Sequence, residues 1–182
     1  MEAFARADVV RVVLTGSEST GKSTLAADLA RHYGAELVSE FVRAFAEQKG
    51  APIDFSDHGA IARGQMALED AAIARAGRLI VQDTDLLSTV LYCRHYFGRC
   101  PPWIEETAAA RRPHLYLLCA TDVAWVADGV RDRGHMRDEM QQFFAAAVRA
   151  SGARFVDVAG PAERRLEEAT KAIDAVIATS LG

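Results

Sequence analysis

A glycine-containing stretch near the start of the chain constrains its fold more than any other feature. Residues 16–24 read GSESTGKST and fit the pattern G-x-x-x-x-G-K-[ST]. A β-branched run over residues 9–15 precedes the stretch, and Leu25, Leu29 and Tyr33 follow it at helical spacing. Strand, glycine loop and helix form the context in which this pattern binds phosphate. The chain therefore predicts a phosphate-binding loop at the carboxyl end of a buried strand.

The residue types in this loop suit a nucleoside triphosphate. Gly16 and Gly21 allow positive φ angles, so backbone N–H groups can surround phosphate oxygens, and the next helix adds its positive end. Lys22 can reach the β- and γ-phosphates, and the Ser23 hydroxyl can bind the Mg²⁺ that bridges them. We expect ATP and Mg²⁺ as cofactors, and the residues expected to bind them are Gly16, Ser17, Glu18, Ser19, Thr20, Gly21, Lys22, Ser23 and Thr24.

A later apolar run ends in two carboxylates. Residues 78–85 read RLIVQDTD, which predicts a third strand that brings Asp83 and Asp85 beside the phosphate loop. If the strand persists that far, its two-residue period places both carboxylates on one face. One could hold Mg²⁺ through water while the other accepts the proton of an attacking hydroxyl, with Asp83 the metal ligand if Asp85 is the base. Either aspartate, or Thr84, could instead cap the following helix.

Charged residues also follow the second predicted strand, residues 36–39. Open α/β sheets bind their ligands beyond the carboxyl ends of the strands. Glu40 and Arg43 are therefore candidates for substrate binding, and the Glu40 carboxylate could accept hydrogen bonds from sugar hydroxyls. The alternative is an exposed pair of charges at the start of a helix.

An arginine-rich segment, DGVRDRGHMR at residues 128–137, follows the fourth predicted strand. Its glycines allow hinge motion, and guanidinium groups stabilise charge on a transferring phosphoryl group. We therefore predict a lid over about residues 128–137, with Arg131 as a catalytic residue and Arg137 as a nucleotide-binding one. The alternative is a solvated helix end.

Strands and helices alternate along the whole chain, which favours an α/β fold with a parallel sheet covered by helices on both faces. With 182 residues, the simplest organisation is a single domain over residues 1–182. Five apolar runs are expected to form the sheet, near residues 9–15, 36–39, 78–85, 114–119 and 154–159.

The composition favours a small-molecule partner. A net charge of −4 argues against a large face for nucleic acid. The apolar runs are too short to span a membrane and no signal peptide is visible, so we expect a cytoplasmic protein. Cys93, Cys100 and Cys119 fit neither a disulfide framework nor a zinc pattern. The helix faces do not decide between a monomer and a homo-oligomer.

Four segments together resemble the ribosylnicotinamide kinase domain of NadR-type proteins, a family of phosphate-loop kinases. They read GSESTGKST, SEFVR, QDTDLLSTVLYCRHYFG and WVADGVR, and the resemblance runs from Val9 to about Phe155. It implies a nucleoside-kinase-like fold with sheet order 2-3-1-4-5 and ATP-dependent phosphorylation of nicotinamide riboside to the mononucleotide. It also implies functional roles for Lys22, Ser23, Asp85 and Arg131.

Two features depart from that family. The helix-turn-helix and adenylyltransferase domains of full-length NadR have no counterpart here, so regulation and NAD synthesis do not carry over. The family is also expected to sandwich the nicotinamide ring between aromatic side chains, where this chain has Ser39 and Asp70. Phe41, Phe45 and Trp103 are candidate replacements, and Phe41 is a candidate substrate-binding residue. The alternatives are a kinase for another nucleoside or cofactor precursor, and a nucleotide-binding regulatory module. Two carboxylates and an arginine-rich segment favour phosphoryl transfer.

Overall fold

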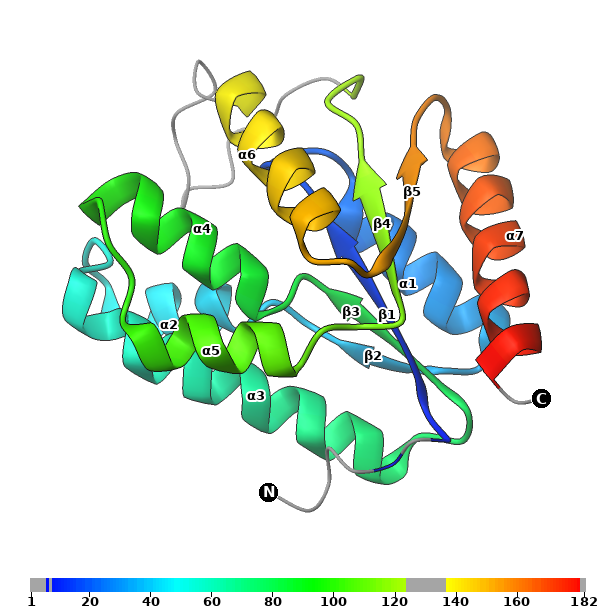
Figure 1. The fold of residues 1–182 in the computed structure, drawn as a ribbon, viewed down its shortest axis with the longest axis horizontal. Coiled ribbons are helices and arrows are strands. Elements are labelled where there is room, and N and C mark those ends of the chain that lie inside the picture. Colours follow the sequence, from blue (N-terminus) through cyan, green and yellow to red (C-terminus); the bar gives the residue numbers. More distant parts are fainter. Residues whose placement is uncertain (1–5, 7, 124–136, 181–182) are drawn as a thin grey trace.

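The fold is built on a five-stranded parallel sheet in the order β2-β3-β1-β4-β5 (Figure 1). The computed structural model describes residue 6, residues 8–123 and residues 137–180. This architecture confirms the predicted α/β fold and strand order. The strands are β1 (Val10–Thr15), β2 (Glu36–Val38), β3 (Leu79–Asp83), β4 (Leu115–Cys119) and β5 (Arg154–Val158).

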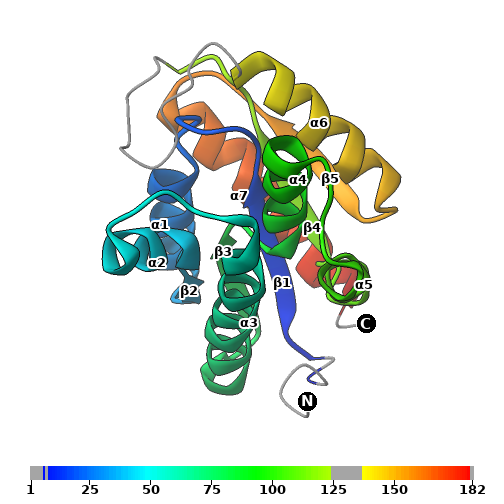
Figure 2. The same ribbon diagram turned by 90° about the vertical axis from the view of Figure 1, so that its left-hand side faces the viewer.

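Helices connect the strands and cover both faces of the sheet. α1 and α7 pack against each other and against the sheet on one face, while α3 and α6 pack on the other beside α4. Figure 2 shows α1 and α6 on opposite sides of β1. The helices are α1 (Lys22–Tyr33), α2 (Phe41–Lys49), α3 (His58–Arg75), α4 (Leu86–Phe97), α5 (Pro102–Ala110), α6 (Arg137–Ala150) and α7 (Ala162–Ser180), with a 3₁₀ turn η2 (Phe55–Asp57) before α3.

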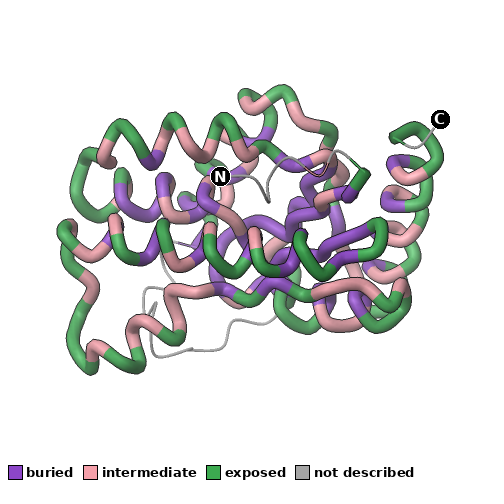
Figure 3. The backbone as a smooth tube through the Cα atoms, turned by 90° about the horizontal axis from the view of Figure 1, so that it is seen from below, coloured by how far each residue is buried: buried purple, intermediate pink, exposed green. Residues whose placement is uncertain are grey.

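The core lies at the central strands, where burial is concentrated (Figure 3). Val10, Val12 and Leu14 of β1 pack with Leu29 and Ile173 on the face covered by α1 and α7. A parallel strand between two helical layers is buried on both faces, so it needs a nearly continuous apolar run. The apolar runs that predicted the strands are therefore direct consequences of this architecture.

The third strand ends earlier than the sequence pattern predicted. β3 stops at Asp83, and Thr84 turns the chain with a φ of 68°, an unusual angle for a β-branched residue. Asp85 then begins the next helix as its N-cap. The two aspartates therefore do not share one strand face, because the strand does not persist to Asp85.

The predicted lid falls mostly on residues outside the described part of the chain. Arg131 and the rest of residues 128–136 lie there, whereas Arg137 opens α6 and is described. Among the described residues, no helix is both long and apolar enough to cross a membrane.

Candidate functional site

The phosphate loop, residues 16–21, joins β1 to α1. Gly16 and Gly21 have φ angles of 128° and 79°, and Ser19 between them has a φ of 53°. A Cβ atom at Gly16 would lie 2.8 Å from the backbone oxygen of Cys119 at the end of β4. The loop is therefore packed so closely on the sheet that only glycine fits at its first position.

Lys22 lies across this loop rather than in solvent. Its side chain is buried, and Nζ donates hydrogen bonds to the Ser17 carbonyl oxygen at 2.5 Å and to Thr20 Oγ1 at 3.3 Å. The ammonium group is thus held over the concave side of the glycine loop at the N-terminus of α1. A cation in this position, next to the positive end of a helix, suits the binding of an anion.

Three side chains from distant helices hold the loop in place. Gln141 of α6 accepts a hydrogen bond from the Ser17 N–H at 2.9 Å, and Arg165 of α7 donates one to the Thr20 carbonyl at 2.7 Å. Arg137 donates to the Ser19 carbonyl at 2.9 Å. Of these three, only Arg137 was predicted at the site. Gln141 and Arg165 were missed because a side chain that bonds a distant backbone group leaves no local sequence pattern.

Asp83 stands beside the start of α1. Burial raises the pKa of the Asp83 carboxyl, a hydrogen bond from Ser23 opposes this, and the negative charge of Glu40 raises the pKa further. Its Oδ1 atom is buried and has no hydrogen-bond partner within the described residues. A buried, unsatisfied carboxylate oxygen next to a serine hydroxyl is a donor set that fits Mg²⁺, which prefers oxygen ligands. Ser23 and Asp83 therefore fit the predicted metal site.

Asp85 is engaged by the protein itself. Its Oδ1 accepts a hydrogen bond from the Leu87 N–H at 3.0 Å, which caps α4, and its Oδ2 accepts one from the Tyr116 hydroxyl at 2.7 Å. Burial raises its pKa to about 6, although the Tyr116 hydrogen bond opposes this shift. The structure thus brings Asp83 to the phosphate loop and uses Asp85 as a helix cap, the alternative that the sequence left open.

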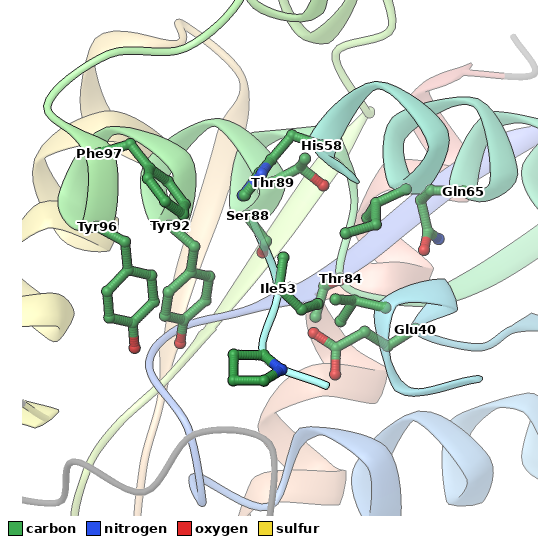
Figure 4. A pocket seen from close by; sticks show the side chains of 13 residues that line it. Glu40, Ile53, His58, Gln65, Thr84, Ser88, Thr89, Tyr92, Tyr96 and Phe97 are labelled. Atoms are coloured by element: carbon green, nitrogen blue, oxygen red, sulfur yellow. The ribbon is translucent and has the colours of Figure 1, made fainter. Parts of the chain in front are cut away.

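A cavity of about 470 Å³ lies between α3, α4 and the segment before α3. Figure 4 shows its polar end at Glu40 and Gln65 and its aromatic end at Tyr92, Tyr96 and Phe97. This volume is in the range of small-molecule sites. The cavity therefore offers hydrogen-bonding groups at one end and flat apolar surfaces at the other.

A buried hydrogen bond connects this cavity to the phosphate loop. The Tyr92 hydroxyl donates to Oε2 of Glu18 in the loop at 3.1 Å, and the Tyr92 ring stacks on Tyr96 with a centroid separation of 6.1 Å and an interplanar angle of 15°. The wall of the cavity is thus in direct contact with the loop. A molecule in the cavity would lie next to whatever the loop binds.

The predicted substrate residues are not all in the cavity. Glu40 lines it, and Oε2 of Glu40 accepts a hydrogen bond from Nε of Arg43 at 3.0 Å. Arg43 supports that carboxylate without belonging to the described lining. Phe41 is also absent from the described lining, since its ring lies against α3 so closely that a Cβ atom on Gly64 would be 2.2 Å from it.

Comparisons with known proteins agree with this geometry. A family model described as an AAA domain matches residues 11–165. The trifunctional NAD biosynthesis/regulator proteins NadR of Escherichia coli (strain K12) and Salmonella typhimurium (strain LT2) are 32% and 31% identical to this chain over 153 residues, which is 81% of the chain. The chain spans only 37% of the length of either relative.

Solved structures show the same fold. A NadR protein in complex with NR (nicotinamide riboside) matches with a TM-score of 0.81 and 21% identity, covering 97% of this chain and 53% of that one. A NadR protein in complex with NAD and AMP-PNP matches with a TM-score of 0.73 and 21% identity, covering 94% of this chain and 50% of that one. Thymidylate kinase from Ehrlichia chaffeensis matches with a TM-score of 0.65 and 16% identity, covering 91% of this chain and 98% of that one. The fold is therefore that of the phosphate-loop kinases.

Proposed function

The chain belongs to the AAA domain family, and on that premise we propose that it is an ATP-dependent kinase that converts nicotinamide riboside to nicotinamide mononucleotide. One observation carries the proposal: the Tyr92–Glu18 hydrogen bond joins the phosphate loop to an adjoining cavity of small-molecule size. A kinase needs this juxtaposition, because the acceptor hydroxyl must lie in line with the γ-phosphate. The relation to NadR proteins supports the choice of acceptor.

The contacts around the phosphate loop support a separate proposed role for each residue there. The loop N–H groups and Lys22 hold the triphosphate, and Ser23 with Asp83 would hold Mg²⁺. When bound, Mg²⁺ neutralises charge on the phosphate oxygens. Arg137, fixed on the Ser19 carbonyl, adds a positive charge at the edge of the loop. We keep Arg131 as a proposed catalytic residue from the resemblance, since it lies outside the described residues.

The acceptor is proposed to lie along the cavity, with its ribose at the polar end and its ring at the aromatic end. Glu40 and Gln65 offer groups that can bond sugar hydroxyls. Tyr96 and Phe97 offer aromatic faces, which attract a flat cationic ring by about 0.5 to 2 kcal/mol each when well placed. The cavity thus supplies aromatic contacts in place of the expected ones at Ser39 and Asp70.

Two wider proposals accompany this function. Residues 1–182 act as one kinase domain, which is supported by the fact that the loop follows β1 and that the cavity residues Glu40 and Thr84 follow β2 and β3 of the same sheet. The protein is proposed to work in the cytoplasm, where ATP and cofactor precursors are available. A kinase for a different nucleoside is the second candidate, favoured by Ser39 and Asp70 at the positions where the family is expected to carry aromatic residues.

A panel assay tests the function. The purified protein is incubated with ATP·Mg²⁺ and each of several nucleosides and cofactor precursors, and ADP release is followed. We expect nicotinamide riboside to give the largest increase over the reaction without acceptor. If another acceptor responds and nicotinamide riboside does not, the kinase activity stands with a different substrate. If no acceptor responds while ATP is hydrolysed slowly, a regulatory ATPase replaces the kinase.

A further inference from the structure

We propose that Glu40 is the general base of the phosphoryl transfer. This inference rests on the proposed kinase function and adds a residue role that neither the sequence pattern nor the comparisons assign. In the reaction, the acceptor oxygen forms a bond to the γ-phosphorus while the bond from that phosphorus to the β–γ bridging oxygen breaks. The electron pair of the broken bond leaves with ADP, and the hydroxyl proton passes to the Glu40 carboxylate.

Three carboxylates, Glu40, Asp83 and Asp85, lie at the carboxyl edge of the sheet. Asp85 uses one oxygen to cap α4 and the other to bond Tyr116. Asp83 contacts Ser23 and fits the metal. Glu40 is the carboxylate of these three that lines the cavity proposed for the acceptor. A base must come within hydrogen-bond reach of the proton that it removes, so position favours Glu40 over both aspartates.

Glu40 also lies at the carboxyl edge of the sheet, which is the edge where the phosphate loop follows β1. It follows β2, which pairs in parallel with β3 so that Val38 lies opposite Gln82. Glu40 after β2 and Asp83 at the end of β3 therefore share this edge. Figure 4 shows the Glu40 carboxylate beside Thr84, the residue between the two aspartates. An acceptor hydroxyl between Glu40 and the phosphate loop would therefore have a carboxylate next to it.

The surroundings hold Glu40 in a defined position. Gln65 of α3 binds the backbone on both sides of it, because its Oε1 accepts from the Phe41 N–H at 2.9 Å and its Nε2 donates to the Ser39 carbonyl at 3.4 Å. Arg43 donates to one carboxylate oxygen at 3.0 Å. Such a charge-assisted bond restricts the rotation of the carboxylate, and a fixed base transfers a proton more effectively than a mobile one.

The test compares Glu40→Gln with Asp85→Asn and with a matched control, Glu36→Gln, which lies at the other end of β2 and bonds Arg75. For each variant, kcat and KM are measured with the best acceptor, the acceptor affinity is measured by calorimetry without ATP, and the fold is checked by thermal unfolding. We expect Glu40→Gln to lower kcat about 10²-fold or more with acceptor affinity changed less than about threefold. Asp85→Asn and Glu36→Gln should keep most of the turnover.

Three results would overturn the assignment. A normal kcat with weaker acceptor binding in Glu40→Gln would make Glu40 a sugar-binding residue only. Recovery of kcat at high Mg²⁺ would make it a metal ligand. A large kcat loss in Asp85→Asn with a normal unfolding curve, and none in Glu40→Gln, would return the base to Asp85. If Glu40→Gln fails to fold, Glu40→Asp decides: the base role predicts a partial loss of kcat at unchanged acceptor affinity, and unchanged kcat would exclude it.

The failure of this assignment is distinguishable from failure of the proposed function. If wild-type protein transfers phosphate to any acceptor and Glu40→Gln does so equally well, only the base is wrong. If the wild-type protein transfers phosphate to no acceptor, the kinase function falls and the base assignment falls with it.

Discussion

The phosphate loop and the cavity proposed for the acceptor touch each other, but they are specified in different ways. The loop and the first residues of α1 form one continuous stretch, residues 16–24, whose glycines and lysine fix its shape and charge. The cavity is assembled from the end of β2, residues 52–53, α3 and α4, which are far apart in the chain. Anion binding can therefore be encoded locally, whereas the choice of acceptor depends on how distant elements pack together.

This comparison predicts that damage to the loop stops the reaction, while damage to the cavity changes only which acceptor is used and how well. Lys22→Ala should give the largest effect, a fall in kcat of about 10²-fold or more, because it removes the positive charge at the loop that is proposed to stabilise the transferring phosphoryl group. Steady-state kinetics measures this, with the exposed α7 residue Lys171→Ala as the control. Near-normal turnover in a folded Lys22→Ala protein would exclude the loop as the site of transfer.

Two glycines test the comparison directly. At Gly16, where a Cβ atom would lie 2.8 Å from the backbone oxygen of Cys119, alanine should weaken ATP binding roughly tenfold or more. At Gly64, alanine would displace the Phe41 ring and with it the neighbouring Glu40. That variant should raise KM for the acceptor and leave KM for ATP unchanged.

The outcome of this pair separates the two regions. Opposite effects, on ATP for Gly16→Ala and on the acceptor for Gly64→Ala, would show that the regions bind different substrates. If Gly64→Ala changes KM for ATP as much as KM for the acceptor, the cavity is not a separate acceptor site.

A smaller effect is expected at the aromatic end of the cavity. Tyr96→Ala should raise KM for nicotinamide riboside by about three- to tenfold, the equivalent of one lost aromatic contact, with KM for ATP unchanged. Trp103→Ala is the matched control, because this exposed aromatic residue of α5 lies outside the described cavity lining. Equal kinetics for Tyr96→Ala and wild type would show that the ring of the acceptor does not bind against Tyr96.

The fold and the phosphate loop could be predicted because both depend on local patterns. Apolar runs predicted the five strands, of which the central β1, β3 and β4 are largely buried on both faces, and the glycine pattern predicted the loop. The resemblance to NadR-type kinases predicted the strand order, which the structure confirms. The individual strands and the loop are therefore contained in short windows of sequence, whereas the strand order was predicted from four segments spread along the chain.

The details of the site depended on long-range contacts and local backbone geometry. The positive φ of Thr84 separates the environments of Asp83 and Asp85, and a residue of this type gives no sequence signal for such an angle. Gln141 and Arg165 reach the loop from later helices. No short-range pattern could predict these contacts, because the residues meet only after the helices pack on the sheet.

The smallest effect concerns Asp85, the N-cap residue of α4. Its pKa of about 6 in the folded protein exceeds the ordinary value of 3.8, so the folded state holds a proton that the unfolded chain releases. The resulting stabilisation is present below about pH 4 and is lost as the pH rises to about 6. Between about pH 4 and pH 6, the free energy of unfolding of the wild type should fall by about 1 to 2 kcal/mol relative to that of Asp85→Asn.

Urea unfolding at several pH values, without nucleotide or metal, measures this difference. Tyr116→Phe sharpens the test, because it removes the hydrogen bond that opposes the pKa rise of Asp85. In that variant the free energy of unfolding should fall by more between the same two pH values. A difference between wild type and Asp85→Asn that grows in favour of wild type with rising pH would show that the folded protein prefers the ionised form of Asp85.

The central claim is that the loop and the cavity act together, so that the γ-phosphoryl group moves from ATP to a hydroxyl of the molecule in the cavity. It is tested most directly by supplying ATP with three ¹⁸O atoms at the non-bridging positions of the γ-phosphate, together with Mg²⁺ and nicotinamide riboside, and analysing the products by mass spectrometry. The account predicts nicotinamide mononucleotide that carries all three ¹⁸O atoms, formed in equal amount to ADP. Unmodified riboside beside ADP and labelled inorganic phosphate would contradict it, because the γ-phosphoryl group would then have passed to water.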